Sequence, residues 1–242
     1  MMPHAGRVDG RGAEEFRSMF VDTKVLSQAR GSCYVEIGST KLMAAVFGPR
    51  QSDRKFVFSE TGRLQCDVRY ASFAAGGGAK QEQTVVERAM AAAITQALEP
   101  AVQLDKFPKA VVEVVIFVME AGGGELAAAI TAASMALADA GVEMHDLVAA
   151  CSVARCGNQL LLDPTSPEAT SADASALVAL MPAHTKVTQL SLTGTWDGAT
   201  GQGEGQGASW RHALELAMGG CVQLNATMRE VLLEKAAALV QA

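Results

Sequence analysis

The sequence predicts an α+β fold in two layers, built from two pseudo-repeated halves of the βαβ type. β-rich runs precede a helical segment twice, first between residues 25 and 98 and again between residues 110 and 140. In each half, a β-rich pattern is followed by a helical one. The 242 residues can bury a large core as one sizeable domain or as two fused halves. We expect a single domain over residues 1–242, with a short extension over about 1–8.

The first half begins with a hairpin signal. Two β-rich runs, residues 33–37 and 42–46, are separated by Gly38-Ser39-Thr40-Lys41. Gly48-Pro49 is expected to end the second strand. Alternation over residues 63–70 predicts a third strand, and a glycine-rich loop over 74–80 follows it. Helical spacing then predicts a helix over residues 84–98, which stops before Pro100.

The second half repeats this order. Residues 110–119 form a β-branched run suited to the core of a sheet. Residues 125–140 form an alanine-rich segment that is apolar nearly all round and ends at Gly141, so we expect a buried helix. A final helix is expected over about residues 209–240. Four further strands are predicted over residues 147–153, 159–162, 177–181 and 187–192.

Composition limits the possible functions. Hydrophobic residues make up 49% of the chain and charged residues 19%, so we expect permanent contacts with other subunits to cover apolar surface. The net charge of −6 argues against strong unaided binding of nucleic acid, because such affinity comes mostly from Lys and Arg. Any RNA contact is expected to be local or shared with partners.

Cysteine usage and hydropathy indicate an intracellular protein. The five cysteines are scattered, odd in number and without a CxxC pair, which predicts free thiols in a reducing compartment. The start of the chain shows neither a secretory signal nor a transit peptide. The most apolar helical segment, residues 126–138, is too short to span a bilayer. A soluble intracellular protein is therefore expected.

A glycine loop lies between the strand over 110–119 and the helix that follows it. It reads Ala121-Gly122-Gly123-Gly124-Glu125-Leu126. Backbone N–H groups at a helix N-terminus can hold phosphate, and glycines allow its close approach. Glu125 opposes this use, because a carboxylate in the first helical turn takes the free N–H groups itself and repels phosphate.

The order of short motifs along the chain resembles that of the RNase PH family. The likeness covers roughly residues 9–233, and its strength comes from the ordered co-occurrence of motifs that are weak singly. The motifs are Asp9-Gly10-Arg11, residues 26–32, residues 38–41, Gly48-Pro49, Cys66-Asp67-Val68-Arg69-Tyr70, Ala97-Leu98-Glu99-Pro100, residues 138–142, Asp146-Leu147-Val148, Leu162-Asp163-Pro164-Thr165 and Ala179-Leu180-Met181-Pro182. The resemblance implies the RNase PH fold, also described as ribosomal protein S5 domain 2-like.

The family's chemistry is phosphorolysis, in which inorganic phosphate attacks the last RNA linkage and releases a nucleoside diphosphate. It needs a basic, hydroxyl-bearing loop for the phosphate and paired acids for Mg²⁺. Active members carry Gly-Gly-Ser/Thr-Arg in the loop, where this chain has Gly124 and Glu125 in the last two places. The two family aspartates correspond to Ala169 and Ser175, and Asp173 lies out of register.

The family's basic pair ahead of the Ala-Leu-Glu-Pro motif corresponds to Val85 and Val86. With the phosphate, metal and RNA contacts changed together, we expect no enzymatic activity, no cofactor and no metal. Within the family, the chain most resembles a type of eukaryotic RNA exosome ring subunit that lacks a catalytic site of its own.

The resemblance implies a structural role in a six-membered ring around a channel for single-stranded RNA. The chain would complete the ring, contact other RNase PH-like subunits and cap subunits, and support 3′-to-5′ RNA processing in the nucleus, nucleolus and cytoplasm. Arg63, Arg69 and Lys80 are the candidates for contact with the RNA backbone. Two alternatives remain: an active phosphorolytic 3′-to-5′ exoribonuclease with a site shared across a subunit boundary, and an RNA-binding adaptor outside the exosome.

Overall fold

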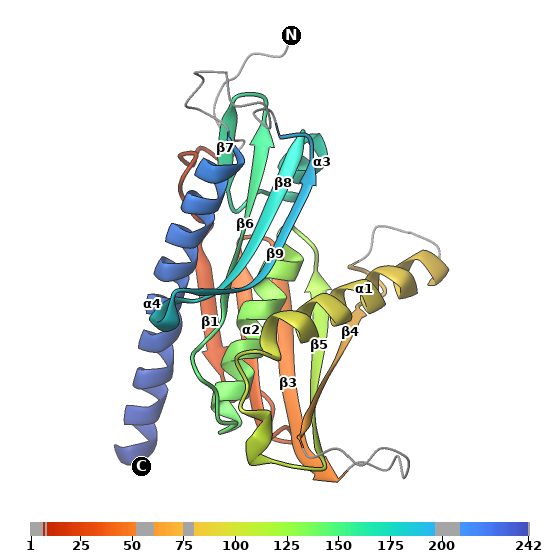
Figure 1. The fold of residues 1–242 in the computed structure, drawn as a ribbon, viewed down its shortest axis with the longest axis vertical. Helices are drawn as coiled ribbons and strands as arrows, with labels where there is room; N and C mark the ends of the chain where they lie inside the picture. The colour runs from red at the N-terminus through yellow and green to blue at the C-terminus, as the bar shows by residue number, and fades with distance from the viewer. Residues whose placement is uncertain (1–6, 8, 52–60, 75–79, 197–208, 242) are drawn as a thin grey trace.

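The computed structural model describes residues 7, 9–51, 61–74, 80–196 and 209–241. Their strands form two sheets, and four helices pack on or between them (Figure 1). The α+β class expected from the sequence is confirmed.

The first sheet has five strands in the order β1-β2-β3-β5-β4. Their bounds are β1 Met19–Thr23, β2 Gly31–Ile37, β3 Thr40–Gln51, β4 Arg63–Tyr70 and β5 Ala110–Glu120. β4 and β5 pair in parallel through the crossover helix α1, Lys80–Leu98, whereas the other pairs are antiparallel. The side chains of β5 alternate between buried and less buried positions, so one face of the sheet meets the core.

The second sheet has four antiparallel strands in the order β7-β6-β8-β9. Their bounds are β6 Ala149–Cys156, β7 Gln159–Leu162, β8 Ala174–Met181 and β9 Lys186–Gly194. The two halves therefore differ in detail, since the parallel pairing of a βαβ unit occurs in the first sheet. The short helix α3, Ser166–Ser171, connects β7 to β8.

Helix α2, Glu125–Asp139, lies between the two sheets. Its residues 127–137 are all buried, as the all-round apolar pattern predicts. Its few polar side chains accept hydrogen bonds from both sheets. Ser134 accepts from the Val148 N–H at 2.8 Å beside the second sheet, and Asp139 accepts from the Ser32 N–H at 3.0 Å in the first.

Helix α4, Trp210–Gln241, covers the outer face of the second sheet. Cys151 of β6 faces α4, because a side chain at Gly220 would lie 3.1 Å from its sulfur. The preceding residue, Ala150, bonds through its N–H to Thr131 of α2. Successive strand residues point to opposite faces, so α2 and α4 lie on opposite sides of this sheet.

Several element boundaries differ from the sequence-based predictions. β3 continues past Gly48-Pro49 to Gln51, with an irregular register between Phe47 and Arg50, so the predicted strand end is wrong. Helix α1 begins at Lys80 rather than at residue 84, and β8 begins at Ala174 rather than at 177. Strand β1 and helix α3 were not expected. Most of the predicted glycine-rich loop, residues 75–79, lies outside the described residues.

All five cysteines are free thiols, as expected. Burial raises the pKa of Cys33 and Cys221 to about 12 in each case. Within the described residues, the helices are too short or too polar to cross a membrane.

Candidate functional site at the glycine loop

The glycine loop connects β5 to α2 and packs tightly against two other segments. A Cβ at Gly122 would lie 2.0 Å from the Ser39 hydroxyl, and one at Gly123 would lie 2.5 Å from the Ser166 nitrogen. Gly123 and Gly124 have φ values of +105° and +69°. Glycine is required here by both space and backbone conformation.

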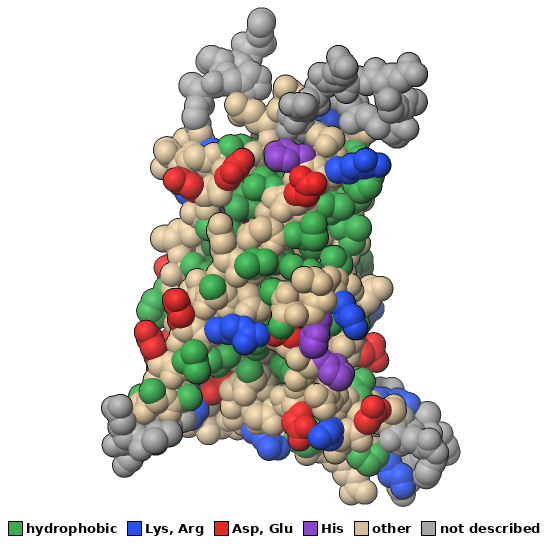
Figure 2. Space-filling model, turned by 60° about the vertical axis from the view of Figure 1, so that its left-hand side comes forward, with side chains coloured by type: hydrophobic (Ala, Val, Ile, Leu, Met, Phe, Trp, Pro, Cys, Tyr) green, Lys and Arg blue, Asp and Glu red, His purple; other side chains and the backbone are tan. Residues whose placement is uncertain are grey.

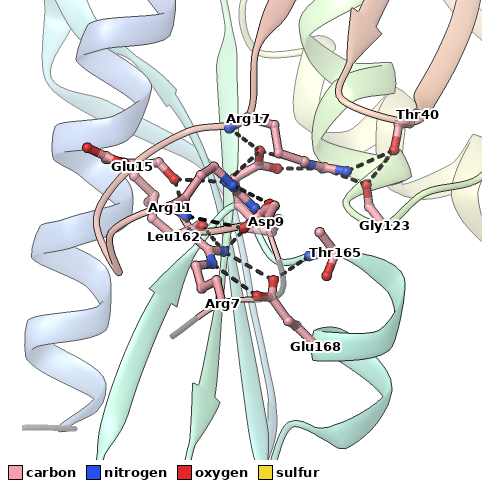
Figure 3. A network of polar contacts seen from close by, with 12 residues as sticks. Arg7, Asp9, Arg11, Glu15, Arg17, Thr40, Gly123, Leu162, Thr165 and Glu168 are labelled. Carbon is pink, nitrogen blue, oxygen red and sulfur yellow. Dashed lines mark hydrogen bonds and ion pairs between the residues drawn. The ribbon is translucent and has the colours of Figure 1, made fainter. Parts of the chain in front are cut away.

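A buried arginine, Arg17, connects this loop to the second half of the molecule through hydrogen bonds (Figure 3). The guanidinium of Arg17 donates to the carbonyl oxygens of Gly122 at 3.1 Å and Gly123 at 2.8 Å. It also donates to both carboxylate oxygens of Asp163, at 2.8 Å through Nε and 2.6 Å through Nη2. Thr40 donates to the same Gly123 carbonyl at 2.8 Å. The loop is held by contacts from β3, from the segment before β1 and from the turn after β7.

Glu125 lies in the first turn of α2, as the sequence predicts. Its carboxylate accepts a hydrogen bond from the Gly123 N–H at 2.9 Å. Gly123 immediately precedes the N-cap residue Gly124, so this bond holds the carboxylate beside the start of the helix, where an anion would bind. The chain therefore supplies its own negative charge at the N-terminus of α2.

Further acidic groups increase the negative charge beside the loop. Burial, together with the nearby carboxylates of Glu125 and Glu87, raises the pKa of Tyr70 to about 12. Glu87 accepts the Tyr70 N–H at 2.9 Å. The negative charge of these carboxylates disfavours the binding of a phosphate ion and keeps the Tyr70 phenol protonated.

The loop also has no hydroxyl at residue 124. A Cβ placed at Gly124 would lie 3.3 Å from the Ser152 hydroxyl and 3.5 Å from an Asp163 oxygen. The Ser152 hydroxyl is buried and has no hydrogen-bond partner among the described residues. A serine or threonine side chain would project toward this hydroxyl, and Gly124 does not supply one.

The two positions expected for metal-binding aspartates carry no carboxylate. Ala169 is exposed on α3, and Ser175 on β8 lies with its hydroxyl 2.6 Å from that of Thr193. Asp173 accepts the Gly157 N–H at 2.8 Å, so its carboxylate caps the turn between β6 and β7. The described residues contain no cluster of three or more metal-ligating side chains, and those at this site do not fit Mg²⁺.

The candidate RNA-binding cations do not form one cluster. Arg63 and Arg69 are exposed at opposite ends of β4, about 20 Å apart at 3.3 Å per residue. Arg69 lies at the end of the sheet that leads into the glycine loop, because β4 runs parallel to β5, and it pairs with Asp67 at 3.1 Å. Lys80 begins α1, and its side chain lies outside the described residues.

Val85 and Val86, which replace the family's basic pair, are exposed at 66% and 50% in the first half of α1. Sequence reasoning did not single out Arg17, which belongs to no recognisable motif. It also missed Glu87, whose acidic side chain is buried beside Tyr70.

The fold and the glycine loop place the chain in a known family of RNA-degrading proteins. Residues 15–143 match domain 1 of the 3′ exoribonuclease family (RNase PH), and residues 146–198 match domain 2. The chain belongs to this family, as the ordered motifs predict.

Its curated relatives include exosome complex components. It is 36% identical over 235 residues to the Arabidopsis thaliana exosome complex component RRP41-like, covering 96% of this chain and 86% of the relative. It is 39% identical over 242 residues to human MTR3, covering 93% and 86%. This relative confirms the expected likeness to a eukaryotic RNA exosome ring subunit.

Solved structures show the same fold at lower identity. Rice Rrp46 matches with a TM-score of 0.78 at 21% identity, over 92% of this chain and 98% of that one. A chain of the Archaeoglobus fulgidus exosome, solved with RNA bound to the active site, matches with a TM-score of 0.71 at 21% identity, over 91% and 92%.

Proposed function

We propose that this chain is a non-catalytic structural subunit of the RNA exosome core ring. It completes the ring, contacts other RNase PH-like subunits and cap subunits, and lines part of the channel for single-stranded RNA. The proposal is supported by relatives that are themselves exosome complex components and match at least 93% of this chain. By the same likeness we propose residence in the nucleus, the nucleolus and the cytoplasm.

One observation carries the non-catalytic part of the proposal. The Glu125 carboxylate accepts the Gly123 N–H at the N-terminus of α2, where a phosphate would need that donor and a cation. An anion brought there would lose a hydrogen-bond donor and meet a negative charge at close range. Ala169 and Ser175 remove the carboxylates that would hold a metal ion. Phosphorolysis therefore lacks both its nucleophile and its metal in this chain.

The RNA-lining part rests on the exposed cation Arg69 and on the position of Lys80 in the fold. Arg69 lies at the loop end of β4, and Lys80 opens the helix that follows β4. Arg63 would contact RNA at a separate point, because it lies at the other end of the strand. Substituting all three by glutamine should reduce ultraviolet crosslinking of RNA to this chain in the assembled complex, and unchanged crosslinking would exclude the RNA-lining role.

The second candidate function is suggested by the family's name, 3′ exoribonuclease. It is an active phosphorolytic 3′-to-5′ exoribonuclease whose site is shared across a subunit interface. The test is an assembled complex supplied with single-stranded RNA, with and without inorganic phosphate. Nucleoside diphosphates are measured after every other RNase PH-like subunit has been inactivated. We expect none, and phosphate-dependent release that persists would assign the activity to this chain.

A single substitution tests whether the site lacks more than one of the features that phosphorolysis needs. Glu125→Arg restores the missing cation but leaves Gly124, Ala169 and Ser175 unchanged. We expect it to remain inactive. Phosphate-dependent release from Glu125→Arg alone would contradict the conclusion that several features of the site are missing.

A further inference from the structure

Strand β9 forms one edge of the four-stranded sheet. It pairs with β8 on one side, and none of the described strands pairs with it on the other. Thr188 is an extra residue between Val187 and Gln189 in this pairing, so the regular part of the edge runs from Gln189 to Gly194. In that part, backbone groups on the outer side have no ladder partner.

The other sheet edges carry features that discourage pairing with a further strand. β4 places three charged side chains along its eight residues, namely Arg63, Asp67 and Arg69. β1 has five residues and includes Asp22, and β7 has only four residues. β9 has nine residues with a single charge, Lys186 at its start, and contains no proline. Edge strands of monomers are usually short, charged or interrupted by proline, so β9 differs from a protected edge.

Apolar side chains accompany this unprotected edge. Leu190 is 49% exposed and Leu192 is 39% exposed. They lie opposite Val178 and Ala176 of β8 and therefore share a face with them. That face is the one covered by α4, because the Cys221 thiol of α4 lies 3.5 Å from the Val178 carbonyl oxygen.

Helix α4, which covers this face of the sheet, also exposes an apolar side chain. Val222 follows Cys221 and is 54% exposed. Figure 2, which brings α4 forward, shows hydrophobic side chains gathered in a band across the middle and upper part of this side of the molecule. Charged side chains lie above and below the band. The exposed surface thus combines open backbone groups with apolar side chains.

We propose that the β9 edge, residues 189–194, pairs with an extended and largely uncharged strand of a neighbouring RNase PH-like subunit. Leu190, Leu192 and Val222 contact that subunit's apolar side chains. A strand is the occupant that satisfies a row of free N–H and C=O groups, as in β-strand addition. RNA fits poorly, because residues 187–194 contain no cation. The inference rests on the proposed ring function and assigns this surface to one of its subunit contacts.

The first test places charges on the strand. In the double variant Leu190→Glu, Leu192→Glu, assembly would bury two carboxylates without partners. We expect recovery of this chain in the mixed assembly, measured by native mass spectrometry, to fall by at least about tenfold. The matched control is Leu233→Glu on α4, which changes a leucine that is 69% exposed and lies eleven residues beyond Val222. Wild-type recovery of the double variant, or equal loss in both, would overturn the proposal.

The second test does not depend on how the variants fold. Amide hydrogen exchange is compared between the isolated wild-type chain and the assembly. Strand pairing should slow exchange at alternate amides of residues 189–194 by at least about tenfold, because alternate residues of an edge strand direct their N–H outward. Unchanged exchange across these residues would overturn the proposal.

The two tests also separate this proposal from the ring function. If the wild-type chain assembles only with itself, the mixed ring is wrong. The β9 contact is then tested by the oligomeric state of the double variant. Dissociation of the variant to monomers supports the contact, and an oligomer unchanged from the wild type overturns it.

Discussion

Arg17 and Asp163 form a buried, bidentate ion pair that joins the two halves of the molecule. Their side chains are 5% and 8% exposed, and the same guanidinium holds the carbonyls of Gly122 and Gly123. Asp163 also accepts the Arg17 backbone N–H at 3.1 Å. A single side chain thus connects the glycine loop to the turn after β7.

Removing the arginine should destabilise the fold strongly. Arg17→Met removes the bidentate partner of the buried Asp163 carboxylate, which keeps only the residue-17 backbone N–H and a longer contact with Arg11 at 3.9 Å. It also removes one hydrogen-bond donor from each of two loop carbonyls. We therefore expect the free energy of unfolding to fall by about 3–5 kcal/mol. Urea denaturation followed by circular dichroism measures it.

The matched control is Arg69→Met, because Arg69 is an exposed arginine whose pair with Asp67 is open to solvent. Its loss should cost about 0–1 kcal/mol. Equal effects of the two variants would show that burial does not set the strength of the Arg17 pair.

Two glycines should respond in opposite directions to alanine. A Cβ at Gly31 would lie 2.2 Å from the Ala140 nitrogen, whereas one at Gly219 in α4 would meet nothing within 4 Å. Gly31→Ala forces β2 and the end of α2 apart and should cost at least about 1–3 kcal/mol, as overpacking does. Gly219→Ala should stabilise the helix by about 0.5–1 kcal/mol. Thermal unfolding of both variants measures this, and a stabilising Gly31→Ala would refute the close packing of β2 on α2.

Alkaline pH should destabilise the protein through its buried thiols. Burial raises the pKa of Cys33 to about 12, whereas the thiol of the unfolded chain titrates near pH 8.5. Above about pH 8.5 the unfolded state loses a proton that the folded state keeps. The free energy of unfolding therefore falls with rising pH, by about 1.4 kcal/mol per pH unit for each such thiol.

Replacing one thiol tests the assignment. Cys33→Ala should reduce the slope of unfolding free energy against pH between about 9 and 11 by the contribution of one thiol. Urea denaturation at several pH values gives that slope. A slope identical to that of the wild type would show that Cys33 does not keep its proton in the folded state.

Neutralising Glu125 should weaken the helix terminus without creating an enzyme. Glu125→Gln keeps a hydrogen-bond acceptor for the Gly123 N–H but removes the charge, so we expect a loss of about 0.3–1 kcal/mol. Isothermal titration with inorganic phosphate should show no binding, since the cation at the loop, Arg17, is already paired with Asp163 and bonded to the loop carbonyls. Phosphate binding to this variant would show that the carboxylate alone blocks the site.

The sequence predicts the elements whose patterns are local. The apolar helix after the glycine loop was expected to be buried because nearly every position is apolar, and α2 is buried between both sheets. Glu125 was expected at a helix N-terminus because a strand, glycines and an alanine-rich run occur in that order. These features depend on neighbouring residues and can be read from the sequence alone.

Features set by tertiary contact were not predictable. Strand β1 has five residues and lacks clear alternation, so its pairing with β2 defines it. The function of Arg17 depends on Asp163, which lies 146 residues away. Helix α3 did have a local signal, since Thr165 and Glu168 form a capping box. That signal was missed because the helix has only six residues.

The cations show the limit of spacing arguments for the site. Arg63 and Arg69 lie on one strand, and each was expected to be a candidate for contact with the RNA backbone. The strand separates them along its length, and only Arg69 lies at the end next to the glycine loop. Each residue of an extended strand adds about 3.3 Å, so two cations that are close in sequence but at opposite ends of a strand lie too far apart to share one RNA contact.

The composition of the native assembly tests the central claim most directly. Native mass spectrometry of the tagged chain, recovered gently from its own cells, counts the copies and identifies the neighbours. We predict one copy of this chain among distinct RNase PH-like and cap subunits. A homo-hexamer would contradict the account and would place the interpretation of Glu125, Ala169 and Ser175 as lost catalytic positions in error.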